Sequence, residues 1–158
     1  VRLTAQGRRG ALRTIRRHRV IESYLVYALG YGWDEVHDEA ERLEHAASDD
    51  LIDRMARAIG EPRVDPHGAP IPSREGSVDE TPYATLAEAR VGAPVRIMRV
   101  ADEDPDLLRH LADLSLTPGS FVTVVENAPY GGPITLHTGQ RDVVIGPALA
   151  ERLLIESI

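Results

Sequence analysis

The sequence predicts an α+β protein in which an all-helical N-terminal unit precedes a small β-barrel. Apolar residues recur with a helical period as far as residue 60. Prolines and glycines then interrupt the chain repeatedly between residues 61 and 81. From residue 83 onward, short apolar runs alternate with turn signals, a pattern typical of a small barrel.

The first unit is expected to contain three helices. Thr4 is a suitable N-cap for the first helix, and Gly30 is a suitable C-cap. The second helix is predicted at about residues 34–46. Ser48 caps the third helix, which Gly60 ends. Because the connecting turns are very short, the three helices should pack as neighbours.

The second unit is expected to consist of five short strands. A helix over residues 106–114 lies between the first two, and an acidic run precedes it. The predicted strands are 94–100, 120–126, 133–137, 142–145 and 153–155. The predicted domain boundaries follow from these elements: a helical domain at 1–72, a polar linker at 73–82 and the barrel at 83–158.

Composition narrows the class of protein. With 42% hydrophobic and 27% charged residues, the chain has a globular rather than a disordered balance. No apolar run approaches the roughly 18 residues of a membrane-spanning helix, so no membrane association and a cytoplasmic location are expected. The absence of Cys excludes disulfides, thiolate ligands and cysteine nucleophiles.

Charge is distributed unevenly along the chain. The net charge is -7, yet residues 1–20 contain seven arginines and no acidic residue. This segregation has two interpretations: the N-terminal end lies near a polyanion, or it is a helix face that pairs with the acidic segments.

Histidines and glutamates border the apolar sides of the first two helices. One helical turn separates His18 from Glu22, so both project from the same side of the first helix. The second helix carries four more such groups within an arc of about 100°. The six candidate ligands are His18, Glu22, His37, Glu41, Glu44 and His45.

Such a set of groups at the edge of a core needs a common partner, because uncompensated buried carboxylates are costly. A divalent cation satisfies both imidazole and carboxylate groups, and Mn, Fe, Co and Zn accept these ligands. A surface helix with solvated or Arg-paired side chains is the plainer alternative. A two-metal hydrolase would use similar ligands, but no nucleophile context or phosphate-binding loop accompanies the cluster.

The third helix carries an apolar stripe formed by Leu51, Ile52, Met55 and Ile59. With part of the second helix, this stripe is the best candidate for the seam of a homodimer. The alternative is that it belongs to the core of the helical domain.

Several sequence stretches resemble the diphtheria toxin repressor family of iron- and manganese-dependent transcriptional regulators. The resemblance covers nearly the whole chain, and residues 83–158 are similar to that family's Src-homology-like, FeoA-like domain. The stretches are Leu3-Thr4-Ala5-Gln6-Gly7-Arg8, Arg17-His18-Arg19-Val20-Ile21-Glu22, the run from Val36 to His45, and Asp65-Pro66-His67-Gly68-Ala69-Pro70-Ile71-Pro72.

The resemblance implies two metal sites in a domain that also dimerises. The ancillary site matches His18, Glu22 and His37, and the primary, regulatory site matches Glu41, Glu44 and His45. Iron-responsive members carry Cys at the position of Glu41 and manganese-responsive members carry Glu. Mn(II) is therefore the expected ion, with Fe(II), Co(II), Ni(II) and Zn(II) as alternatives.

The resemblance also implies a function and a departure from the family pattern. Members begin with a winged helix-turn-helix that binds operator DNA, whereas this sequence begins where the wing would end. The chain is therefore expected to be the metal-sensing and dimerisation part of a repressor without enzymatic activity, and its primary site is expected to be incomplete. The alternatives are a metal-binding hydrolase and a stand-alone FeoA-like interaction module.

The acidic run in the second unit has two readings. Some family members take further ancillary ligands from the barrel, and Glu103 or Asp104 would serve here. The plainer reading is that the run compensates the dipole of the helix that follows it.

Overall fold

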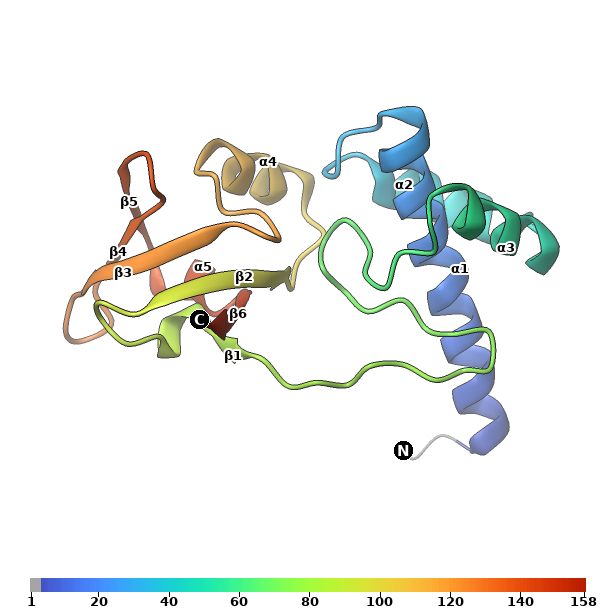
Figure 1. The fold of residues 1–158 in the computed structure, drawn as a ribbon, viewed down its shortest axis with the longest axis horizontal. Coiled ribbons are helices and arrows are strands. Elements are labelled where there is room, and N and C mark those ends of the chain that lie inside the picture. Colours follow the sequence, from blue (N-terminus) through green and yellow to red (C-terminus); the bar gives the residue numbers. More distant parts are fainter. Residues whose placement is uncertain (1–3) are drawn as a thin grey trace. The chain divides into compact units, whose positions relative to one another are not determined.

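The computed structural model describes residues 4–158, which divide into two compact units at Thr81 and Pro82 (Figure 1). Arg2 and Leu3 lie outside the described residues, although the first belongs to the arginine-rich segment and the second to a family motif. No helix in the described range is both long and apolar enough to span a bilayer.

The first unit contains the three predicted helices, α1 (Ala5–Leu29), α2 (Val36–Glu44) and α3 (Asp49–Ala58). The predicted caps of α1 are confirmed, since the Thr4 hydroxyl accepts a hydrogen bond from Gly7 N and Gly30 ends the helix at φ 76°. Ser48 caps α3 in the same way. Each of these ends is set by a local side chain or backbone preference.

The second helix is shorter than the predicted range of 34–46. Glu35 occupies the N-cap position of α2 without making a side-chain capping bond, so Asp34 and Glu35 do not extend the helix. At the other end, Ala46 and Ala47 donate their N–H groups to Leu43 O and close the last turn.

The core of the helical unit is built from apolar residues of all three helices. Ile52 lies within it at 2% exposure, with Met55 packed against its edge. Leu51 is 43% exposed, so the predicted stripe on α3 is divided between core and surface. The buried members of the core are Val20, Ile21, Leu25, Val36, Ala40, Ala47, Ile52 and Ala56.

The proline-interrupted segment after α3 lies alongside α1 (Figure 1). Two side chains of α1 hold this segment: Arg16 donates to Pro72 O at 3.0 Å, and Arg19 donates to Pro70 O. Within the segment, Asp65 Oδ1 accepts the N–H groups of His67 at 2.8 Å and Ala69 at 2.9 Å. These bonds fix the turn that carries His67.

The arginines of α1 pair with acidic residues of the same unit. Arg17 lies 2.8 Å from Asp49, which also pairs with Arg13. Arg16 lies 3.0 Å from Asp53. Arg13, Arg16 and Arg17 therefore form a helix face that pairs with acidic residues, as the second interpretation of the charge pattern predicts.

The second unit is an antiparallel six-stranded sheet in the order β1-β6-β2-β3-β4-β5 (Figure 1). Its five longer strands confirm the predicted ones: β2 (Pro94–Val100), β3 (Phe121–Asn127), β4 (Ile134–His137), β5 (Asp142–Ile145) and β6 (Leu153–Ser157). The two-residue β1 (Ala84–Thr85), the 3-10 helix η1 (Leu86–Glu88) and the short α5 (Pro147–Ala150) were not predicted.

The small sheet domain agrees with the predicted fold class, but the sheet is open. In the described chain β1 pairs with β6 and β5 pairs with β4, and no ladder joins β1 to β5 to close a barrel. With only two residues, β1 forms a short ladder with β6. The predicted helix between the first two long strands is α4 (Pro105–Asp113), whose Leu108 and Leu111 are buried.

Ile52→Ala is expected to lower the free energy of unfolding of the helical unit by about 2–5 kcal/mol, because a cavity replaces a buried side chain. Arg54→Ala, on the same helix, is the control: it removes a surface ion pair with Asp50 and should leave stability almost unchanged. Urea unfolding followed by emission of Trp33, the single Trp of the chain, reports on this unit. Equal losses in the two variants would contradict the assignment of Ile52 to the core.

Candidate metal centre

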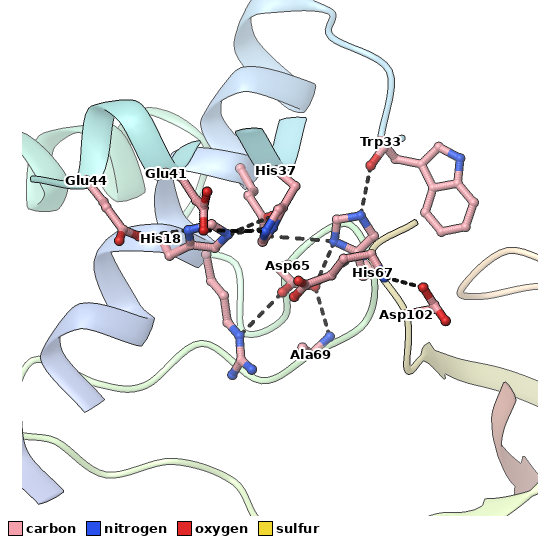
Figure 2. Close-up of polar contacts among 12 residues, drawn as sticks. His18, Trp33, His37, Glu41, Glu44, Asp65, His67, Ala69 and Asp102 are labelled. Atoms are coloured by element: carbon pink, nitrogen blue, oxygen red, sulfur yellow. Dashed lines mark hydrogen bonds and ion pairs between the residues drawn. The ribbon is translucent and has the colours of Figure 1, made fainter. Parts of the chain in front are cut away.

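The side chain of His18, on α1, contacts two residues of α2 (Figure 2). Its Nδ1 lies 2.8 Å from Glu44 Oε2. Its Nε2 lies 3.0 Å from Glu22 Oε1 and 3.2 Å from His37 Nδ1. One imidazole on α1 therefore meets two side chains of α2 and the carboxylate one turn away.

His37 completes a first cluster with His18 and Glu22. His37 Nδ1 lies 3.5 Å from Glu22 Oε1, and the two imidazole rings meet edge to face with centroids 4.8 Å apart. The ligand atoms of the three residues all lie within 4.8 Å of one another. Two ring nitrogens and a carboxylate oxygen at this spacing suit a divalent cation.

A second cluster consists of Glu22, Asp65 and His67, which are all buried. His67 Nδ1 lies 3.8 Å from Glu22 Oε2 and 4.0 Å from Asp65 Oδ1. Glu22 thus belongs to both clusters, with Oε1 toward the first and Oε2 toward the second. Sequence analysis did not assign Asp65 or His67 as ligands, although the motif Asp65-Pro66-His67-Gly68 contains them both.

The hydrogen bond of His67 to a backbone carbonyl determines what its other nitrogen can do. His67 Nε2 lies 2.8 Å from Trp33 O, and only a protonated ring nitrogen bonds to a carbonyl oxygen (Figure 2). In the neutral ring, Nδ1 then carries a lone pair, which faces the carboxyl groups of Glu22 and Asp65. A metal ion at this position would be shared by His67 Nδ1 and the two carboxyl groups.

The pKa values of the buried groups reflect this electrostatic coupling. Burial lowers the pKa of His18, but hydrogen bonds to Glu22 and Glu44 outweigh burial and raise that pKa to about 9. Burial alone would raise the pKa of Glu22. The hydrogen bond from His18 and the charge of His18 outweigh this effect, so the pKa of Glu22 is lowered. The pKa of Asp65 is raised by burial and by the charge of Glu22.

Of the other three predicted ligands, Glu41 and Glu44 lie in the C-terminal half of α2 and His45 is its C-cap. Glu44 contacts His18, whereas Glu41 Oε1 lies 3.8 Å from His37 Nε2. His45 is largely exposed, with Nε2 at 3.3 Å from Glu44 Oε1. In residues 4–158 only the two clusters above bring three donors within 4.8 Å, so Glu41, Glu44 and His45 do not converge on one point here.

The acidic run of the second unit makes local contacts. Asp104 is the N-cap of α4 and accepts from Leu107 N at 3.0 Å. Asp102 Oδ1 accepts the N–H groups of Glu103 and Asp104. These bonds support the reading of the run as compensation of the helix end.

Comparisons with known proteins define the class to which this arrangement belongs. Residues 4–73 match the family described as iron dependent repressor, metal binding and dimerisation domain, and residues 84–157 match the FeoA domain. The chain is thus a metal-binding and dimerisation domain of transcriptional repressors followed by a FeoA domain.

Individual relatives agree with this class. The iron-dependent repressor IdeR of Mycobacterium tuberculosis is 33% identical over 99% of this chain and 73% of its own length. The diphtheria toxin repressor of Corynebacterium diphtheriae is 30% identical over 100% of this chain and 73% of its own length. A solved manganese-dependent transcriptional repressor in complex with manganese is 41% identical, with a TM-score of 0.94 over 100% of this chain and 76% of that one.

The chain therefore belongs to the iron-dependent repressor family, which includes the diphtheria toxin repressor. This membership supports the prediction of a metal-dependent regulator over the alternatives of a hydrolase and a stand-alone interaction module. The relatives are repressors rather than enzymes.

The metal-free protein is expected to lose stability as the pH rises from 6.5 through about 9. Folded His18 keeps its proton up to about pH 9, whereas unfolded His releases it near pH 6.5. Between these values the folded state binds more protons, so the stabilisation present below pH 6.5 is lost progressively. Urea unfolding of the chelator-treated protein at several pH values measures the slope, and His18→Gln should flatten it. The same slope in both proteins would contradict the assignment.

Proposed function

We propose that this chain is the metal-sensing and dimerisation part of a manganese-dependent repressor of metal-homeostasis genes. The observation that carries the proposal is the placement of Glu22 between the imidazoles of His18 and His37 on one side and of His67 on the other. This placement supplies donors to two neighbouring cation positions.

The donor set favours Mn(II) over softer ions. All donors are imidazole nitrogen or carboxylate oxygen, and the chain contains no Cys to offer a thiolate. Carboxylate oxygens suit Mn(II), whereas thiolates select softer ions. Fe(II), Co(II), Ni(II) and Zn(II) remain alternatives, since imidazole-rich sites bind them more tightly and Mn(II) selectivity must come from coordination geometry.

The proposal assigns ligands in three groups. His18, Glu22 and His37 hold one ion, and Asp65 and His67 hold an ion that shares Glu22. Glu41, Glu44 and His45 remain the proposed ligands of the primary site, as the family resemblance implies. Glu44 Oε2 contacts His18, and Glu44 Oε1 lies 3.3 Å from His45 Nε2, on the side of the proposed primary site.

Metal binding would act on the geometry of the helical unit. A bound ion supplies positive charge that offsets the buried carboxylates. The chain's own part is to bring α1, α2 and the Asp65 turn to that charge, because each element contributes a donor. An ion that binds one arrangement of these elements better than others shifts the population toward that arrangement.

We infer a homodimer, and operator DNA bound through a winged helix-turn-helix outside residues 1–158. A transcriptional regulator acts where the chromosome is, so the proposal includes a cytoplasmic location. No catalytic step is assigned to these residues.

Titration of the metal-free protein with Mn(II) or Co(II), followed by emission of Trp33, tests metal binding. Trp33 stacks on His67 with ring centroids 5.6 Å apart, so an ion at His67 Nδ1 should change the emission. Glu22→Gln is expected to weaken binding at least about tenfold, because it removes a charged donor from both clusters. Glu39→Gln, at a partly exposed position of α2 where Glu39 pairs with Arg42, is the matched control. Equal affinities of the two variants would contradict the proposal.

Sedimentation analysis tests the dimer. Leu51 and Leu43 are partly exposed apolar residues of α3 and α2, at the predicted seam. Leu51→Glu is expected to raise the dimer dissociation constant at least about tenfold, because a charge at a packed interface loses its hydration. Val91→Glu, at an exposed position of the second unit, is the control and should remain dimeric. A dimer equally stable in both variants would place the seam elsewhere.

A further inference from the structure

A cavity of about 310 Å³ lies between the N-terminal half of α1, the first turns of α3 and residues 73–76. None of its lining residues belongs to the two metal-ligand clusters, and all of them lie in the helical unit. The volume is within the usual range for a small-molecule site. Its cationic lining consists of Arg9, Arg13, Arg16, Arg17 and Arg74.

The cavity wall carries an excess of positive charge. Five guanidinium groups face three carboxylates, those of Asp49, Asp53 and Glu75. Asp49 is shared by two arginines, and Asp53 is shared by another two. Each of these groups of three side chains therefore carries one positive charge in excess. The wall thus has two positive charges in excess, in a chain whose net charge is -7.

Two of the arginines are held rigidly. The side chains of Arg16 and Arg17 are each 17% exposed. Arg16 donates to Pro72 O at 3.0 Å, and Arg17 Nε donates to Glu44 O at 3.0 Å. These carbonyl bonds fix the planes of the guanidinium groups before any ligand arrives, which lowers the entropy cost of binding.

The other arginines form an adaptable rim. The side chains of Arg13 and Arg74 are 64% and 65% exposed; Arg13 pairs with the exposed Asp49, whereas Arg74 pairs with the buried Asp53. The exposed pair of Arg13 with Asp49 contributes little to stability, so Arg13 can exchange this carboxylate for a ligand at small cost. Asp53 also pairs with Arg16 at 3.0 Å, so its buried carboxylate keeps a cation when Arg74 turns toward a ligand. Fixed cations beside mobile ones are suited to enclosing a compact anion.

We propose that this cavity binds a compact polyanion with at least two negative charges, a diphosphate or a tricarboxylate. Guanidinium groups bind phosphate and carboxylate oxygens in bidentate geometry, and several of them can share one such ligand. The concave shape favours a small anion over duplex DNA, whose backbone needs an extended surface. None of the proposed metal ligands lines this cavity, although Arg17 reaches the backbone carbonyl of Glu44.

Calorimetric titration of the metal-free full chain with pyrophosphate, and separately with citrate, tests the proposal at constant ionic strength. The expected result is saturable binding of one anion per chain. The double variant Arg9→Gln/Arg13→Gln should bind at least about tenfold more weakly, because it removes charge-assisted hydrogen bonds. The matched control Arg54→Gln/Arg57→Gln removes the same charge from α3 outside the cavity and should bind within about twofold of the unaltered chain.

Circular dichroism and Trp33 emission establish that each variant is folded. Arg74→Gln, on the loop beside the cavity, provides a second variant that does not alter a helix and should also weaken binding. The preferred anion distinguishes a phosphate ligand from a carboxylate ligand. Absence of saturable binding, an equal loss in the control variant, or saturation with a 20-base-pair duplex alone would overturn the proposal.

Discussion

The helical unit depends on the contacts of the buried Glu22 carboxylate with the imidazoles around it. Glu22 is 2% exposed, and its two oxygens face imidazoles supplied by three different parts of the chain. A carboxylate removed from water is costly unless cations or hydrogen-bond donors surround it. In the metal-free protein the His18 imidazolium provides that charge, and a divalent ion in its place would release the proton.

The proline-interrupted segment forms one wall of this site. Asp65 fixes the turn through two backbone N–H groups, and Trp33 O orients the His67 ring. Two arginines of α1 then hold the carbonyls of Pro70 and Pro72. Positioning of His67 Nδ1 therefore rests on backbone bonds outside the cluster, in the way that second-layer bonds orient metal-ligating imidazoles.

Sequence reasoning succeeded where the determining interaction is local. Thr4 and Gly30 set the ends of α1 through contacts within a few residues, and the one-turn spacing of His18 and Glu22 places them on one side of the helix. The longer strands were predicted by their alternation of apolar and polar residues. In each case the pattern and the structure it produces occupy the same stretch of chain.

The parts that were missed depend on contacts between distant positions. His67 and Glu22 are 45 positions apart, and no periodicity links them, so the second cluster could be recognised only after the segment was folded against α1. The strand β1 has two residues, too few for a pattern, and the open edge of the sheet depends on which strands pair. Convergence of Glu41, Glu44 and His45 on one ion stays a prediction, because it depends on side-chain rotamers that helical spacing does not determine.

An anomalous difference map from crystals of the chain soaked in Mn(II) tests the central claim most directly. The account predicts a peak within coordination distance of Glu22 Oε1 and the imidazoles of His18 and His37, with a second peak between Glu22 Oε2 and His67 Nδ1. A map without a peak at Glu22, in crystals where Mn(II) is bound elsewhere on the molecule, would contradict it.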